Sequence, residues 1–107
     1  MFQTIDNQQL AEGIGKAGIV IVDVRQPEEY AARHIPGAIL APHTDIEVHL
    51  GDLPRDKDLY VHCEVGGRSK YVCETLEASG FTRLFNVVPG MSQWRGVVEK
   101  GLPAGWK

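Results

Sequence analysis

The stretch Val61-His62-Cys63-Glu64-Val65-Gly66-Gly67-Arg68-Ser69 decides the fold predicted for this chain of 107 residues. An apolar run ends at one cysteine, a glycine pair follows, and helical spacing begins after it. We therefore expect a strand that delivers a thiol to the N-terminus of a helix. Unpaired backbone N–H groups and the helix dipole stabilise a negative charge there and lower the pKa of a thiol. The alternative is a buried structural cysteine in a turn.

Short apolar segments and helical patterns alternate along the rest of the chain. The expected strands are residues 2–5, 19–22, 59–62 and 84–88, and a turn leads into a further short apolar run at residues 38–41. The expected helices begin near Asp6, Pro27, Arg68 and Met91. Asp6 and Gln9 have the spacing of a capping box, and one helical turn is expected near residues 45–50. The last helix is expected to run from residue 91 to about 100 and to bury Trp94 and Val97 or Val98.

This alternation predicts an α/β fold in a single domain, residues 1–107, with helices on both faces of a parallel sheet. The continuous β-branched run at residues 19–22 is typical of a strand buried on both faces. Ligands of such folds bind beyond the carboxyl ends of the strands, which is where Cys63 is expected. This placement favours the reactive interpretation of the cysteine.

Composition argues against several classes of function. With 43% hydrophobic residues, 23% charged residues and a net charge of -3, the chain has no basic excess for nucleic acid. The longest apolar run is too short for a membrane helix, and the N-terminus lacks the features of a signal peptide. Cys73 falls on the apolar stripe of its helix and is expected in the core rather than in a disulfide with Cys63. We expect a cytoplasmic protein with no metal and no cofactor.

Four segments of the sequence, in the same order, resemble the rhodanese (sulfurtransferase) family. The loop of residues 63–69 resembles the family's active-site pattern Cys-x-x-Gly-x-Arg-Ser. The other three segments are Asp23-Val24-Arg25 with Glu29-Tyr30, His34-Ile35-Pro36-Gly37-Ala38, and Gly90-Met91-Ser92-Gln93-Trp94. The third of these departs from the family's Gly-Gly-x-x-x-Trp pattern, because Pro89 stands where the first glycine is usual. Together the segments cover about residues 2 to 100.

The resemblance implies a central parallel sheet of five strands and catalysis by Cys63. In this chemistry the cysteine takes a sulfane sulfur from a donor such as thiosulfate, holds it as a persulfide, and passes it to cyanide or a thiol. Residues 64–69 (Glu64, Val65, Gly66, Gly67, Arg68 and Ser69) would form the substrate-binding loop. Their backbone N–H groups are suited to holding a negatively charged sulfur. The partners implied are a small-molecule donor and acceptor, and possible acceptors include a protein.

Side chains around the loop have more than one interpretation. Arg68 either binds an anionic donor or braces the loop by pairing with Glu64 or Asp23. Ser69 fits a helix cap or first-turn residue better than a base. Asp23 and Arg25 are expected to support the site, Asp23 from the sheet edge near Cys63 and Arg25 through an ion pair with Glu29.

Glu64 places a negative charge directly after the cysteine, where basic residues would suit thiosulfate, and this departure bears most on function. If its carboxylate faces the mouth of the loop, it repels a dianionic donor by about 1 kcal/mol, and a neutral or protein-bound persulfide then becomes the better donor. If it pairs with Arg68, its charge is largely cancelled.

Two other functions remain open at this stage. A sulfur-relay or binding module would deliver sulfur to a protein partner without small-molecule turnover. A cysteine-dependent phosphatase or arsenate reductase uses a similar amide-lined loop, but phosphatase loops place five residues between Cys and Arg. Here there are four, Glu64 to Gly67, so a tighter loop suited to one sulfur atom is expected.

Overall fold

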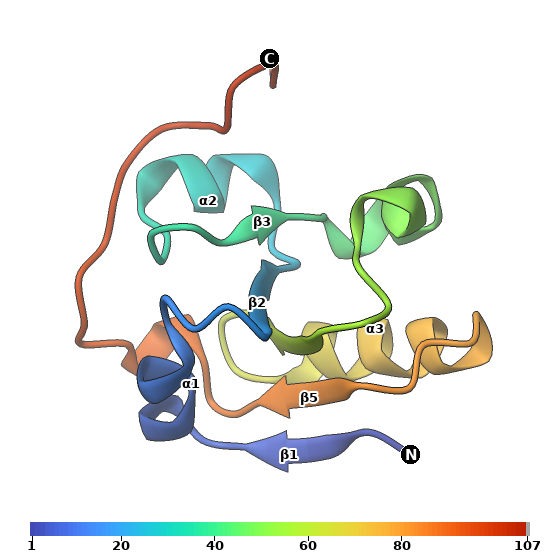
Figure 1. Cartoon of the computed structure of the whole chain (residues 1–107). Helices are drawn as coiled ribbons and strands as arrows, with labels where there is room; N and C mark the ends of the chain where they lie inside the picture. Colours follow the sequence, from blue (N-terminus) through green and yellow to red (C-terminus); the bar gives the residue numbers. More distant parts are fainter. Residues whose placement is uncertain (107) are drawn as a thin grey trace.

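A central sheet of five parallel strands organises the computed structural model, which describes residues 1–106 (Figure 1). The strands are β1 (Gln3–Ile5), β2 (Ile19–Asp23), β3 (Ile39–Leu40), β4 (Asp58–His62) and β5 (Leu84–Val87). Their order in the sheet is β1-β5-β4-β2-β3, and every neighbouring pair is parallel. The predicted α/β class and the five-stranded parallel sheet are therefore confirmed.

Helical segments connect the strands. They are α1 (Asn7–Gly13), α2 (Pro27–Ala32), the 3-10 segment η1 (His43–Asp52), α3 (Gly67–Ala78) and the 3-10 turn η2 (Met91–Gln93). The predicted capping box at the start of α1 is present, because the Asp6 carboxylate accepts the Gln9 N–H at 2.9 Å and the Gln9 side chain accepts the Asp6 N–H at 3.1 Å.

Two hydrophobic clusters cover the two faces of the sheet. Side chains alternate along each strand, so Val22 and Val61 pack in one cluster while Ile21 packs in the other. The first cluster contains the buried stripe of α3 with η1, and the second contains Leu10 of α1 and Tyr30 of α2. Cys63 and Cys73 both lie in the first cluster as free thiols, which confirms the core placement expected for Cys73.

The prediction of a last helix at residues 91 to about 100 is wrong. Only the turn η2 (Met91–Gln93) forms, and residues 94–106 have no regular structure except for an isolated bridge between His34 and Glu99. Trp94 is buried as expected, but Val97 and Val98 are exposed. The indole N–H of Trp94 donates to the Val97 carbonyl at 3.2 Å, so the ring supports an extended tail rather than a helix face.

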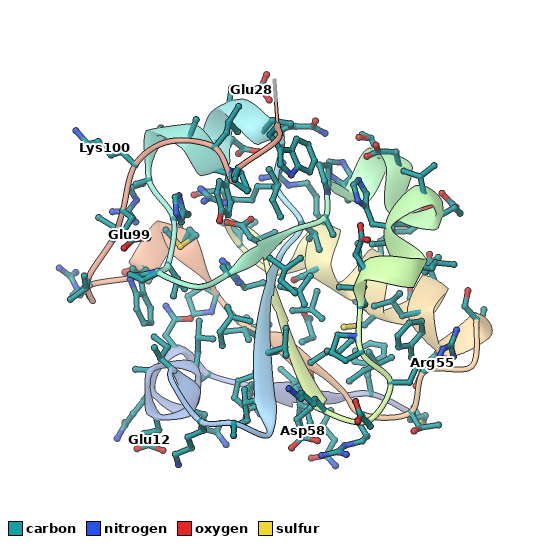
Figure 2. The ribbon with its side chains drawn as sticks, turned by 45° about the horizontal axis from the view of Figure 1, so that its top comes forward. Glu12, Glu28, Arg55, Asp58, Glu99 and Lys100 are labelled. Atoms are coloured by element: carbon teal, nitrogen blue, oxygen red, sulfur yellow. The ribbon has the colours of Figure 1, made fainter. Side chains whose placement is uncertain are left out.

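Apart from the buried Asp23 and Arg25, most charged side chains lie at the periphery of the molecule. Figure 2 shows this for Glu12, Glu28, Arg55, Asp58, Glu99 and Lys100. Within residues 1–106, no helix has the length and apolar character needed to cross a membrane.

Candidate active site

The loop between β4 and α3 carries the candidate nucleophile. Cys63 directly follows β4, and α3 begins at Gly67. Between them Gly66 adopts the left-handed conformation, with φ of 104°, and this turns the chain so that the first amides of α3 face back toward Cys63. A residue with a side chain would be strained at this position, so the glycine is required by the backbone itself.

The Cys63 sulfur is surrounded by hydrogen-bond donors from this turn. It accepts the backbone N–H of Gly66 at 3.2 Å and that of Ser69 at 3.3 Å. The Ser69 hydroxyl oxygen lies 3.4 Å from the sulfur, in the first turn of α3, which fits the expected first-turn placement of Ser69. The geometry is that of an anion site at a helix N-terminus. Cys63 itself has 0% exposure, so the sulfur is covered in this conformation.

The two cysteines differ in acidity. Burial raises the pKa of the Cys63 thiol, but hydrogen bonds from the Ser69, Gly66 and Val65 amides outweigh burial and hold it below its usual value. Burial and the charges of Glu77 and Glu74 raise the pKa of Cys73 to about 12. A thiolate at neutral pH is therefore favoured at Cys63 and disfavoured at Cys73.

Hydrogen bonds from the segment after β5 hold the backbone of the loop in place. The Cys63 carbonyl accepts the Met91 N–H at 2.8 Å, and the Glu64 carbonyl accepts the Ser92 N–H at 3.0 Å. The side-chain amide of Asn7 exchanges two hydrogen bonds of 2.9 Å with the Gly90 backbone. Gly90 has a positive φ and so little room that a Cβ there would collide with the Cys63 carbonyl oxygen.

Arg68 pairs with a carboxylate that the sequence analysis assigned elsewhere. Its guanidinium donates to both carboxylate oxygens of Glu29, at 2.8 and 2.9 Å. Neither Glu64 nor Asp23, the two predicted partners, makes this pair. These two hydrogen bonds join the first turn of α3 to α2, and the Glu29 carboxylate balances the positive charge of Arg68.

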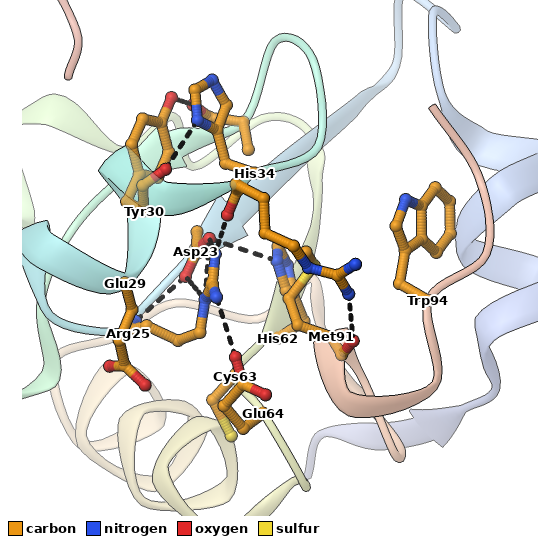
Figure 3. Close-up of polar contacts among 12 residues, drawn as sticks. Asp23, Arg25, Glu29, Tyr30, His34, His62, Cys63, Glu64, Met91 and Trp94 are labelled. Atoms are coloured by element: carbon orange, nitrogen blue, oxygen red, sulfur yellow. Dashed lines mark hydrogen bonds and ion pairs between the residues drawn. The ribbon is translucent and has the colours of Figure 1, made fainter. Parts of the chain in front are cut away.

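Arg25 also differs from expectation, because it does not pair with Glu29. It is 2% exposed and donates to the Asp23 carboxylate at 2.8 to 3.2 Å, to the Glu64 carboxylate at 2.8 Å and to the Arg33 carbonyl at 2.7 Å (Figure 3). Asp23 is therefore brought to the site through Arg25, and Glu64 is held by Arg25 instead of Arg68. The predicted Arg25–Glu29 pair is wrong because the Arg25 side chain turns inward beneath the loop.

The buried Asp23 stays ionised despite its environment. Burial raises the pKa of this carboxyl, but hydrogen bonding and charge from His62 and Arg25 together hold it far below its usual range. His62 Nε2 lies 3.5 Å from the Asp23 carboxylate, because the sheet register places these two residues side by side at the ends of β4 and β2. His62 thus faces away from the Cys63 sulfur, as the strand alternation predicts.

Sequence reasoning missed two residues of this site. Asn86 on β5 is 4% exposed and its side-chain oxygen lies 2.5 Å from the Ser69 hydroxyl. Asn7 anchors Gly90, as described above. A polar residue within the apolar run of residues 84–88 was the signal for Asn86. No comparable signal marked Asn7, because it lies 83 residues from its partner.

Comparison with known proteins places this geometry in a family. The model of the rhodanese-like domain matches residues 6–96. A sulfurtransferase of Allochromatium vinosum is 31% identical over 104 residues, which are 96% of this chain and 94% of that protein. The Bacillus subtilis protein YrkF, named as a candidate sulfur carrier, is 39% identical over 79 residues, which are 74% of this chain but 43% of YrkF. The crystal structure of a rhodanese-like domain protein from Staphylococcus aureus has a TM-score of 0.84 at 34% identity, covering 92% of this chain and 98% of that one.

The chain belongs to the rhodanese-like domain family and shares the fold of the Staphylococcus aureus member. This family includes relatives named as sulfurtransferases and as sulfur carriers.

Proposed function

We propose that the protein is a sulfurtransferase in which Cys63 carries sulfane sulfur as a persulfide. The observation that carries this proposal is the cup around the Cys63 sulfur, with the Gly66 and Ser69 N–H groups at 3.2 and 3.3 Å. These donors are aimed at a single atom and need no reorganisation to stabilise negative charge on it. They favour a nucleophile that is ionised by its surroundings and therefore works without a general base.

The reaction has two balanced steps. With thiosulfate, the Cys63 thiolate attacks the outer sulfur, the sulfur–sulfur bond of the donor breaks, and sulfite leaves with the electron pair. The product is a persulfide anion on Cys63. In the second step an acceptor such as cyanide attacks the terminal sulfur, forms thiocyanate and releases the Cys63 thiolate. Both steps move one sulfur atom and conserve charge.

Access to the sulfur requires the loop to open. Cys63 is 0% exposed, whereas Val65 in the same loop is 68% exposed and makes no side-chain hydrogen bond. Residues 63 and 64 are anchored by the backbone of residues 91 and 92, and Gly66 is held by hydrogen bonds to Cys63 and Ser69. The exposed Val65 is therefore the residue of the loop with most freedom to move. A donor or acceptor then approaches across an apolar rim.

The charges around the loop favour a donor of low charge. Arg68 is neutralised by Glu29 and Arg25 by Asp23 and Glu64, so no cation of residues 63–69 is left unpaired for thiosulfate. We propose that organic or protein-bound persulfides serve at least as well as thiosulfate, and that thiols are acceptors in addition to cyanide.

Mass spectrometry of the intact protein tests the proposal directly. After incubation with thiosulfate or glutathione persulfide, the protein should gain one sulfur atom, and cyanide should remove it. Cys63→Ser should abolish the gain, whereas Cys73→Ser should retain it because the high pKa of Cys73 keeps that thiol protonated. An added sulfur that survives in Cys63→Ser, or none in the wild type with either donor, would contradict the proposal.

A relay to a protein partner is the second candidate. The name of one relative, a candidate sulfur carrier, supports this candidate. Turnover distinguishes the candidates. An enzyme forms thiocyanate through many cycles, whereas a relay module loads one sulfur and discharges it slowly to small acceptors.

A further inference from the structure

The Ser69 hydroxyl has more acceptors around it than it has protons. Its oxygen lies 2.5 Å from Asn86 Oδ1, 3.2 Å from the Gly66 carbonyl oxygen and 3.4 Å from the Cys63 sulfur. A hydroxyl donates one hydrogen bond, so these three acceptors compete for it whenever Cys63 is a thiolate. Ser69 is fully buried and Asn86 nearly so, so the three groups compete within a site shielded from bulk water.

Asn86 Oδ1 is the nearest of the three acceptors and competes most strongly for the Ser69 proton. Its Nδ2 group faces the Gly66 carbonyl at 3.4 Å, which orients its Oδ1 toward Ser69. Since Oδ1 is an acceptor, the short contact of 2.5 Å requires the hydroxyl to donate to Asn86. The Ser69 oxygen then presents a lone pair to Cys63, and this arrangement suits a thiol that donates its proton to Ser69.

We propose that Asn86 is a positioning residue that draws the Ser69 hydroxyl proton away from Cys63 and thereby slows the release of sulfur from the loaded protein. The proposal rests on the sulfurtransferase function proposed above. Its physical basis is that the backbone amides of Gly66 and Ser69 stabilise the sulfur anion at all times, while the hydroxyl does so only when Asn86 gives up the proton.

The consequence for sulfur transfer follows from the leaving group. When an acceptor attacks the terminal sulfur of the persulfide, the bond between the two sulfurs breaks and Cys63 departs as a thiolate. A thiolate of lower basicity leaves faster. By keeping the Ser69 proton, Asn86 makes the Cys63 thiolate more basic, so the persulfide lasts longer and the thiolate that captures the next sulfur is more nucleophilic.

The pH dependence of Cys63 alkylation tests the hydrogen-bond part of the proposal without sulfur chemistry. In a Cys73→Ser background, Asn86→Leu removes the acceptor at 2.5 Å at nearly constant volume and leaves only the more distant Gly66 carbonyl, at 3.2 Å, to compete with Cys63. The midpoint of the iodoacetamide rate profile should fall by about one pH unit, which is the worth of one hydrogen bond to a charged group. Asn86→Asp restores an acceptor, and its midpoint should lie at or above that of the wild type.

Repeating Asn86→Leu in a Ser69→Ala background isolates the pathway. The shift should vanish there, because no hydroxyl proton remains to be redirected. An equal shift with and without Ser69, a midpoint that rises or stays unchanged in Asn86→Leu, or one that falls in Asn86→Asp would overturn the proposal. Asn86→Ala serves the same purpose if circular dichroism shows that Asn86→Leu does not fold.

Other charges near Cys63 are left in place by these substitutions. They are Glu64 of the loop with Arg25, Arg68 of α3 with Glu29 of α2, and His62 of β4 with Asp23 of β2.

Single-turnover discharge tests the functional part. Protein loaded with one sulfur and mixed with cyanide should form thiocyanate about threefold faster in Asn86→Leu, for a one-unit fall in the leaving-group pKa and a Brønsted sensitivity of about 0.5. An unchanged or slower discharge despite the lowered alkylation midpoint would overturn this part. If the wild type never loads sulfur, the alkylation result still stands, so failure of the proposed function and failure of this inference are distinguishable.

Discussion

The Arg25 guanidinium lies 2.8 Å from the Glu64 carboxylate and joins the buried end of β2 to the residue next to the candidate nucleophile. Arg25 is 2% exposed, and the carboxylate of Asp23 lies beside it at 2.8 Å. One cation thus holds a buried and a half-exposed carboxylate together beneath the loop. This pairing engages the Glu64 carboxylate with Arg25 rather than Arg68 and fixes the position of Glu64 at the rim of the cup.

Replacing Arg25 by Met should be strongly destabilising. The substitution leaves the buried Asp23 carboxylate without its main cation, and breaking a buried pair in this way typically costs about 3–5 kcal/mol. Urea unfolding measures the loss. The matched control is Arg83→Met, which removes a half-exposed pair with Asp58 and should cost about 1 kcal/mol or less. Equal losses in the two variants would show that the Arg25 network contributes nothing beyond a surface pair.

Stability should fall in acid partly through Asp23. Its pKa is lower in the folded protein than in the unfolded chain, where it is about 3.9, so the unfolded state binds more protons as the pH drops. The stabilisation is present above pH of about 5 and is lost progressively below it. Asp23→Asn should be less stable at neutral pH and should show a flatter decline between pH of about 5 and 2. A decline as steep as that of the wild type would mean that other groups account for acid unfolding.

Glu64→Gln should change donor preference. Removing the carboxylate takes a negative charge away from the mouth, while Asp23 still balances Arg25. Repulsion of thiosulfate therefore weakens and its apparent KM should fall about fivefold, the effect of roughly 1 kcal/mol in a hydrated site. The kinetics with a neutral organic persulfide should not change. Glu74→Gln, on the exposed side of α3, is the charge-matched control. The idea fails if both donors improve equally or if the control behaves like Glu64→Gln.

Gly90→Ala should damage the site more than other glycine substitutions. Gly90 and Gly101 both have positive φ, so both variants carry a backbone strain of about 1–2 kcal/mol. A Cβ at position 101 meets nothing within 4 Å, whereas one at position 90 collides with the Cys63 carbonyl. We expect Gly90→Ala alone to lose sulfur loading and to unfold at lower urea concentration. Similar behaviour of the two variants would contradict a role for close approach.

Much of this architecture could be predicted because it is written in local patterns. The strand at β4, the glycine turn and the apolar stripe of α3 each depend on neighbouring residues, so hydrophobic spacing located them. The placement of Cys63 followed from the rule that sites of parallel sheets lie at the carboxyl ends of the strands. The family resemblance supplied the number of strands.

The ion pairs could not be predicted for a physical reason. Arg25 and Glu29 lie on one stretch of the chain and Glu64 and Arg68 on another. Which cation meets which carboxylate depends on side-chain directions that only packing sets. Spacing suggested Arg25 with Glu29, but the residues that meet are separated by 39 positions in both pairs, Arg25–Glu64 and Arg68–Glu29. The helix expected after Met91 failed similarly, because Trp94 packs on an extended tail whose backbone it also hydrogen-bonds.

The exposed side chain of Val65 stands in a loop whose main chain is fastened on either side. The carbonyl groups of Cys63 and Glu64 accept hydrogen bonds from the backbone of residues 91 and 92, and Gly66 immediately precedes α3. The Val65 side chain therefore takes no part in holding the cup, although the Val65 amide is one of its donors. A substitution there is expected to change what binds at the mouth while the backbone amides stay in place. Substitutions at position 65 are therefore a means of changing which partners bind without altering the fold of the loop.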